Sequence, residues 1–202
     1  MFQIFLVGIV AVINTVMAGD IVLADTENNN LIIDDRTSGN LNTNLGTKWQ
    51  MVTDNVMGGV SSGKITLDNF KDKDCIRMQG NVSTDNNGGF VQIALPLVDK
   101  QSDDKPFNAS AYTGIEIEVS GNDESYNVHI RTNNLWFPWQ SYRYSFIATP
   151  DWKKYRIPFS KFEAYKTSKN FSQGEIIRIG LVAIGREYKA NICMASVNFY
   201  AE

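Results

Sequence analysis

The chain has 202 residues, of which 43% are hydrophobic and 20% are charged, and its formal net charge is −3 at pH 7. This composition excludes a wholly disordered chain, and the mild acidity removes the electrostatic basis for binding nucleic acid. With one histidine and two cysteines, the chain cannot supply a His/Cys zinc cage or an iron–sulfur cluster.

The amino-terminal residues have the pattern of a targeting segment. An apolar or glycine run spans residues 4–13, no charged side chain precedes Asp20, and small residues surround Ala18. This order predicts a signal peptide over residues 1–18, with a second cleavage position after Ala24. The run is shorter than the ~20 residues of a membrane span. We therefore expect a secreted or periplasmic protein without an integral membrane domain, the alternative being an anchor formed by the uncleaved segment.

Export changes the interpretation of the two cysteines. An oxidising compartment allows one disulfide between Cys75 and Cys193, and a pair of buried free thiols is an equally open alternative.

The mature chain divides into a short leader and one domain. Residues 25–47 are polar apart from Leu31-Ile32-Ile33, which predicts a leader with one short strand. Strand-like runs then recur over residues 48–202, and no stretch keeps a helical period over three turns. We expect strands at 49–53, 64–67, 75–82, 90–95, 115–120, 126–131, 141–146, 152–157, 176–184 and 191–199, with one short helical turn at 160–164.

Alternation within these runs predicts one buried and one polar face. Ile115, Ile117 and Val119 alternate with polar residues, and the run after Tyr126 does the same. The residues 121–123 between these two runs predict a hairpin turn. Short strands without helices predict an all-β fold, an antiparallel β-sandwich or jelly roll.

Two glycine-rich corners stand out. The first runs from residue 54 to 63 and the second from 86 to 90, and both predict tight structural turns in which glycine supplies positive φ angles. A phosphate-binding loop is a poorer fit, because no lysine and no helix follow. The residues of these corners that we single out are Asp54, Gly58, Gly59, Ser61, Gly63, Asn87, Gly88, Gly89 and Phe90.

These corners, in this order, resemble the complex I intermediate-associated protein family. The first reads D-N-V-M-G-G-V-S-S-G and the second N-N-G-G-F, and Trp152 with the segment P-F-S-K-F at 158–162 follows. The resemblance covers about residues 49–199. It implies a galactose-binding-like β-sandwich, close in shape to several carbohydrate-binding modules. It also implies a role in assembling NADH:ubiquinone oxidoreductase, and by analogy a mitochondrial location.

No catalytic set emerges from the sequence. His129 lies on the strand face opposite Val128 and Ile130 and has the features of an ordinary strand histidine. We therefore predict no enzyme activity and no resident cofactor. Two acidic turns would nevertheless suit a structural calcium ion through their oxygen ligands. Their acidic residues are Asp72, Asp74, Asp99, Asp103 and Asp104.

The best candidate binding surface is aromatic. A loop carries Trp136 and Trp139, two tyrosines follow, and polar residues precede it. Such side chains stack on sugar rings and also form protein-binding hot spots, whereas the alternative is a loop whose tryptophans cap the core. The candidate ligand-binding residues are Trp136, Trp139, Tyr142, Tyr144, Arg131, Asn133 and Asn134.

We predict a non-catalytic module that binds a protein partner or a glycan. The leading hypothesis, from the resemblance, is a protein-binding or assembly role. The alternative is a carbohydrate-binding module that uses the aromatic surface. A third hypothesis, a glycan-processing enzyme, requires two carboxylates that face each other across a cleft about 5 to 10 Å apart.

Overall fold

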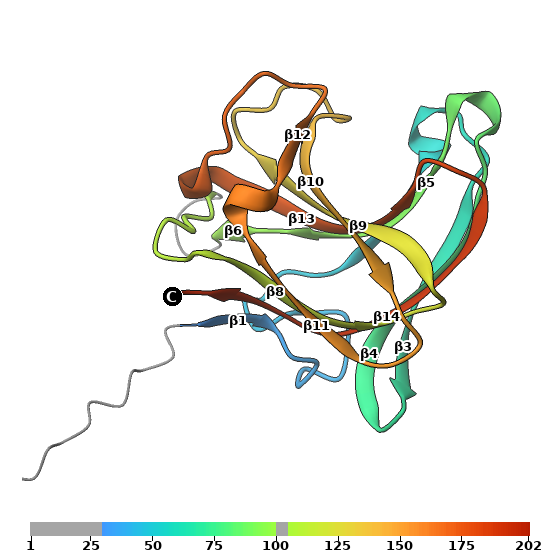
Figure 1. Cartoon of the computed structure of the whole chain (residues 1–202), viewed down its shortest axis with the longest axis horizontal. Coiled ribbons are helices and arrows are strands. Elements are labelled where there is room, and N and C mark those ends of the chain that lie inside the picture. The colour runs from blue at the N-terminus through green and yellow to red at the C-terminus, as the bar shows by residue number, and fades with distance from the viewer. Residues whose placement is uncertain (1–29, 100–104) are drawn as a thin grey trace, which may run out of the picture.

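The computed structural model describes residues 30–99 and 105–202. Two six-stranded antiparallel sheets pack against each other as a β-sandwich (Figure 1). The predicted signal peptide lies outside the described residues, as do Asp103 and Asp104. Within the described ranges, no helix has the length and apolar character needed to cross a membrane.

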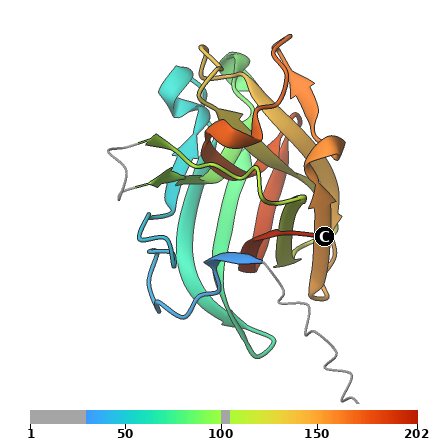
Figure 2. The same cartoon turned by 90° about the vertical axis from the view of Figure 1, so that its left-hand side faces the viewer.

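The first sheet has the strand order β11-β8-β14-β4-β3, and β1 pairs with β14 at its side. Figures 1 and 2 both show β1, in blue, beside the carboxyl-terminal end of the chain. Its strands are β1 (Leu31–Asp34), β3 (Ser62–Phe70), β4 (Lys73–Val82), β8 (Gly114–Ser120), β11 (Lys153–Pro158) and β14 (Tyr188–Tyr200).

The second sheet has the strand order β12-β10-β9-β13-β5-β2. Its strands are β2 (Gln50–Thr53), β5 (Phe90–Pro96), β9 (Glu124–Thr132), β10 (Ser141–Ala148), β12 (Glu163–Tyr165) and β13 (Ile176–Ile184). The remaining elements are β6 (Val98–Asp99), β7 (Lys105–Pro106), and the 3-10 turns η1 (Asp54–Met57), η2 (Asp85–Asn87), η3 (Phe159–Lys161) and η4 (Gln173–Glu175).

The period of two in the sequence places the core as expected. Tyr126, Val128 and Ile130 of β9 are buried between the sheets, and Ile115 and Ile117 of β8 meet them from the first sheet. The intervening residues of β9 face away from the core. The predicted all-β sandwich is therefore confirmed, and the outer face of the second sheet carries polar side chains.

One expected turn is wrong. Residues 121–123 do not close a hairpin, because β8 pairs with β11 and β14 while β9 pairs with β10 and β13. The turn instead carries the chain from one sheet to the other, with Asp123 at a positive φ of 62°. The predicted helical turn at 160–164 is a 3-10 turn over Phe159–Lys161 followed by strand β12.

Residues 30–47, expected as part of a leader, pack onto the sandwich. The buried carboxylate of Asp34 accepts hydrogen bonds from Trp49 Nε1 at 2.6 Å and from Arg36 Nη2 at 2.6 Å. The guanidinium of Arg36 also donates to the carbonyl oxygens of Asn40 and Asn42. This buried ion pair fastens the segment before Trp49 to the domain that follows.

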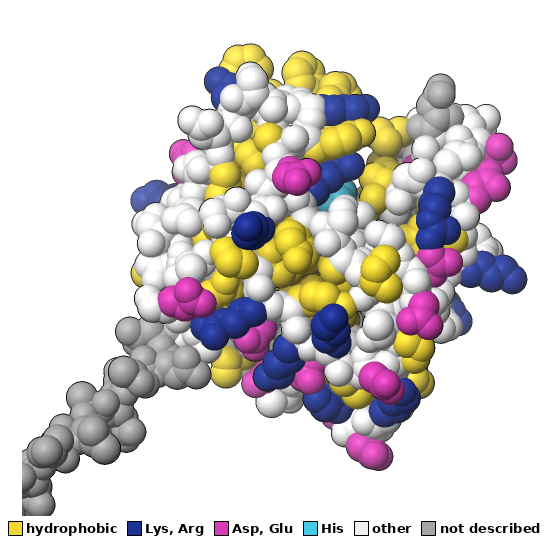
Figure 3. Space-filling model, in the orientation of Figure 1, with side chains coloured by type: hydrophobic (Ala, Val, Ile, Leu, Met, Phe, Trp, Pro, Cys, Tyr) yellow, Lys and Arg dark blue, Asp and Glu magenta, His cyan; other side chains and the backbone are white. Residues whose placement is uncertain are grey.

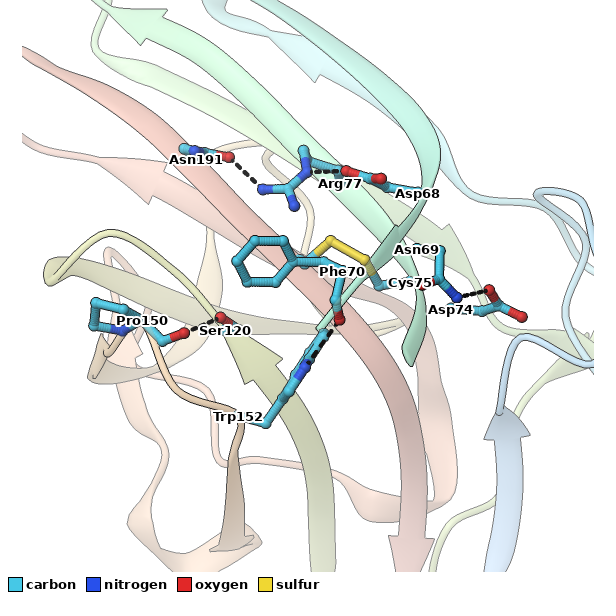
Figure 4. Close-up of a disulfide and its surroundings, with 11 residues drawn as sticks. Asp68, Asn69, Phe70, Asp74, Cys75, Arg77, Ser120, Pro150, Trp152 and Asn191 are labelled. Atoms are coloured by element: carbon cyan, nitrogen blue, oxygen red, sulfur yellow. Dashed lines mark hydrogen bonds and ion pairs between the residues drawn. A yellow bond between two sulfur atoms is a disulfide. The ribbon is translucent and has the colours of Figure 1, made fainter. Parts of the chain in front are cut away.

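A disulfide joins the two central strands of the first sheet. Cys75 of β4 and Cys193 of β14 are bonded, with their Cα atoms 5.6 Å apart, and both are buried. Figure 4 shows Phe70 and Trp152 beside this bond, where Trp152 Nε1 donates to the carbonyl oxygen of Phe70. Arg77 donates to Asn191 nearby, so the outer surface of this sheet is cross-linked by polar as well as covalent contacts.

Asp34→Asn should destabilise the protein by roughly 3 kcal/mol, because it leaves the buried guanidinium of Arg36 without its counter-charge. The free energy of unfolding in urea measures this loss. Asp151→Asn is the control, since its ion pair with Lys71 lies on the surface, and its unfolding midpoint should stay nearly unchanged. Equal behaviour of the two variants would contradict the anchoring role of Asp34.

Candidate functional site

The outer face of the second sheet holds a cleft of about 490 Å³. One wall is formed by the loop before β10 and the end of β12, including Trp139 and Tyr165. The other wall comes from the two glycine-rich corners, including Val56 and Met57. Figure 3 shows the histidine, in cyan, deep between these walls beside dark-blue basic side chains.

His129 lies at the centre of the cleft floor. In the sheet register it stands opposite Arg143 of β10 on one side and opposite Gly180 of β13 on the other. A Cβ atom at position 180 would lie 3.1 Å from the side-chain oxygen of Gln92, so this position of the floor is closely packed and suits glycine.

The imidazole of His129 is neutral and incompletely hydrogen-bonded. Burial lowers its pKa to about 3, and the charges of Arg143 and Arg178 act in the same direction. Its Nε2 atom is buried and has no hydrogen-bond partner. Buried polar atoms usually have a partner, so this nitrogen is an exception among the described residues. The sequence placed His129 on the correct face but did not reveal its burial in a cleft floor.

Three arginines surround the histidine. Arg143 donates from Nε to Ser141 Oγ at 3.0 Å, and its guanidinium carbon lies 3.3 Å from the ring centre of Tyr165. Arg178 and Arg131 stand opposite each other on β13 and β9. Burial lowers the pKa of each guanidinium, although all three remain protonated at neutral pH.

The two tryptophans of the aromatic loop have different positions relative to the cleft. Trp139 lines the cleft, stacks on Phe137 with ring centres 4.9 Å apart, and is 47% exposed. Trp136 is 81% exposed and is not among the residues that line the cleft. The tryptophans therefore do not cap the core, and one of the two is placed to meet a ligand in the cleft.

Two predicted binding residues belong to the other face of the sheet. Tyr142 is buried, and its hydroxyl donates to the carbonyl oxygen of Asn170 at 2.8 Å. Tyr144 packs against Phe162 at the core. Placing these tyrosines on the binding surface was wrong, because alternate residues of β10 point to opposite faces. Their neighbour Arg143 is the one that reaches the cleft.

Of the three polar residues predicted beside the loop, Arg131 lines the cleft and the two asparagines do not. Arg131 lines the cleft, but its guanidinium donates to the carbonyl oxygens of Phe137, Pro138 and Gln140 at 2.7–2.8 Å and so holds the loop in place. Asn134 is tied to Thr132 and Asn170. Asn133 is exposed and, like Asn134, is absent from the cleft lining.

The buried carboxylate of Asp54 joins the two glycine-rich corners. It accepts hydrogen bonds from Ser61 Oγ at 2.5 Å, from the Ser61 amide at 2.9 Å and from the Gly89 amide at 2.5 Å. The Phe90 amide donates to it at 3.3 Å. A Cβ atom at Gly59 or at Gly88 would overlap this carboxyl group. The glycines are therefore required by close approach to Asp54.

Other residues of the corners complete the wall. Gly58 follows η1 at a φ of +87°, Gly89 has a φ of +132°, and η2 ends at Asn87. A side chain at Gly63 would collide with Val91 of β5. The turn leaves Val56 exposed at the rim of the cleft. The motif thus builds a rigid corner whose outer side faces a ligand.

A second hollow is less suited to a ligand. It measures about 620 Å³ and lies over β3, β4 and β14, but its lining contains no aromatic side chain. Neither hollow provides metal ligands: within the two described ranges, no group of three His, Cys, Asp or Glu side chains is arranged to hold a metal ion.

The family assignment follows from the corner that Asp54 organises. The family model of complex I intermediate-associated protein 30 (CIA30) matches residues 41–192, which include both corners and the cleft floor. The chain belongs to this family. No curated protein sequence matches the chain.

Solved structures share the fold at low sequence identity. The family 11 carbohydrate-binding module of the Clostridium thermocellum cellulase Lic26A-Cel5E has a TM-score of 0.66 and 16% identity, over 86% of this chain and 95% of that one. The same family's module in complex with a β-1,3-1,4-mixed-linked tetrasaccharide has a TM-score of 0.65 and 16% identity, over 85% and 95%. A family 30 carbohydrate-binding module has a TM-score of 0.52 and 14% identity, over 71% and 83%.

Sequence reasoning did not find Arg143, Arg178 or Tyr165. The alternation of side chains along β10 places Arg143 on the face opposite the core. The sequence therefore contained a signal for Arg143, between the two core-facing tyrosines. Arg178 and Tyr165 join the cleft through the pairing of distant strands. That pairing has no local signature, and the structure was needed to show it.

His129→Gln should remove a pH-dependent part of the stability. The folded pKa near 3 lies below the unfolded value of 6.5, so the unfolded chain binds more protons and stability falls as pH drops from about 6.5 toward 3. Between pH 7 and pH 5 the wild type should lose on the order of 1–2 kcal/mol more than the variant. Unfolding in urea at both pH values measures this, and parallel pH profiles would show that His129 is not shielded.

Asp54→Asn should destabilise the protein by roughly 2–4 kcal/mol, because the buried amide donors lose a charged acceptor. Burial works to raise the pKa of Asp54, but the hydrogen bonds from Ser61, Gly89 and Phe90 outweigh it and lower the pKa. Asp85→Asn, an exposed substitution in the second corner, is the control and should shift stability by less than about 0.5 kcal/mol. Chemical denaturation compares them, and a small effect at Asp54 would contradict its joining role.

Proposed function

We propose that the protein is a non-catalytic carbohydrate-binding module whose ligand lies in the cleft over His129. The observation that carries this proposal is the cleft itself, whose polar floor around His129 is bordered by Trp139 and Tyr165. Concave sites with a few convergent polar groups are typical of small-molecule binding. The wall aromatics offer flat faces to sugar rings, while Gln92 offers an amide group to hydroxyls.

Binding without hydrolysis fits the composition of the cleft. No Asp or Glu belongs to the described residues that line it, whereas glycoside hydrolysis generally requires two carboxylates. The fold shared with carbohydrate-binding modules is consistent with this proposal but does not identify the ligand.

A protein-binding role of the assembly type is the second candidate. One observation favours it besides the family name: large apolar side chains are exposed at the rims of the cleft, with Trp136 at 81% and Val56 at 73%. Exposed aromatic and apolar groups of this kind are common in protein interfaces. We also propose that the protein is exported from the cell, because residues 1–18 have the pattern of a signal peptide.

A glycan array probed with the purified protein tests the main proposal. Runs with and without calcium also test the structural calcium ion expected from the acidic turns. Specific glycan binding is the expected result. A negative array, obtained with protein shown by circular dichroism to be folded, would contradict the proposal and favour the protein-binding candidate.

Trp139→Ala should weaken binding of an array-positive glycan at least tenfold, or about 1.4 kcal/mol, because it removes a stacking face in the cleft. Calorimetric titration measures the affinity. Trp136→Ala is the matched control on the same loop and should bind as the wild type does. Equal losses in both variants would place the ligand on the outer surface, and a large loss of stability in Trp139→Ala would assign that residue a packing role.

A further inference from the structure

We propose that the cleft selects an acidic glycan, whose carboxylate or sulfate group is bound between Arg143 and Arg178 above His129. This inference rests on the proposed function and specifies the chemical class of its ligand. It follows from the distribution of charge, from the arginine donors left unused, and from the shape of the cleft.

Positive charge is concentrated in the cleft of a chain whose net charge is −3. Four basic residues belong to the lining, Arg131, Arg143, Arg178 and Lys166, and no acidic residue of the described chain accompanies them there. Glu163 stands opposite Arg143 in the sheet register, but its side chain is exposed and no ion pair joins the two. The cleft therefore lacks a counter-charge of its own.

Two of the arginines retain donors for a ligand. The guanidinium of Arg131 is engaged by loop carbonyl oxygens. Arg143 uses its Nε toward Ser141 and interacts with Tyr165 through one face and a side-chain hydrogen bond, which leaves some of its five N–H donors for a ligand. Arg178 forms no hydrogen bond or ion pair with any described side chain. A guanidinium presents paired donors that match the two oxygens of a carboxylate or sulfate.

The position of these donors favours one shared anion site. Arg178 stands opposite Arg131 in the β9–β13 register, and like charges placed opposite each other are destabilising. The electrostatic effects of Arg143 and Arg178 both reach the imidazole of His129. An anion above His129 would offset both guanidinium charges. The cleft over these floor residues provides the space.

The surroundings favour a sugar over a small free anion. The cleft has a volume of about 490 Å³ and extends to the faces of Trp139 and Tyr165. Gln92 and Ser141 add polar groups to the same lining. A ring that carries one anionic group would use the arginines and the aromatic walls together.

Calorimetric titration with matched probes tests this inference on the purified protein. The probes are tetragalacturonate and its fully methyl-esterified form, and a sulfated κ-carrageenan tetrasaccharide and its desulfated form. We expect at least one acidic probe to bind tenfold or more tightly than its neutral partner, with affinity falling as sodium chloride rises from 50 to 300 mM. The carboxylate and sulfate pairs distinguish the two sources of negative charge.

Three variants connect the preference to the cleft. Arg178→Gln should abolish the difference between the acidic and neutral probes, and Arg178→Lys should retain only part of it, because lysine keeps the charge but not the paired donors. Arg156→Gln makes the same change in net charge on β11 of the first sheet and should leave the preference intact. An effect of Arg156→Gln equal to that of Arg178→Gln would overturn the proposed position of the anion.

The outcomes separate this inference from the proposed function. Equal affinity for acidic and neutral probes, or array binding confined to neutral glycans, overturns the acidic preference and leaves carbohydrate binding in place. Absence of binding both to the probes and on the glycan array, with folded protein, overturns the proposed function itself and the inference with it.

Discussion

The strict alternation of side chains along the second sheet is the constraint on which the rest of the structure depends. Its inner face must bury Tyr126, Val128 and Ile130 against the first sheet, so every intervening residue is forced outward. A one-residue slip of β9 would place His129 in the core and expose the tyrosine. The packing that stabilises the sandwich therefore also fixes the floor of the cleft.

The walls of the cleft depend on hydrogen bonds between loop backbone atoms and two charged side chains. Asp54 binds one glycine-rich corner to the other, and Arg131 holds the carbonyl oxygens of the aromatic loop. Both charged groups are satisfied largely by backbone atoms. Such contacts set the shape of a loop without filling the space beside it, which explains how rigid walls coexist with an open cleft.

The strands were predictable from sequence because their patterns are local. The expected run at 176–184 coincides with β13, and the run at 90–95 falls within β5. The sheet to which each strand belongs was not predictable in the same way. The turn at 121–123 has the residues of a hairpin, yet it connects two sheets, because the pairing is decided by distant partners such as β14.

The candidate site was predicted only in part, for the same reason. Trp139 and Arg131 were found because they lie in or beside one conspicuous loop. Tyr142 was included because it follows that loop, although its own alternation places it in the core. Arg178 lies some fifty residues from Arg131 in sequence and becomes its neighbour only through β-sheet register.

The single histidine offers the most direct measurement of the central claim, that a glycan occupies the cleft. Its imidazole gives one set of NMR signals, which can be followed while tetragalacturonate is added to the protein. The account predicts a saturable shift of these signals as the ligand occupies the cleft beside the ring. Glycan binding detected by calorimetry without any change in the imidazole signals would contradict it and place the ligand elsewhere on the molecule.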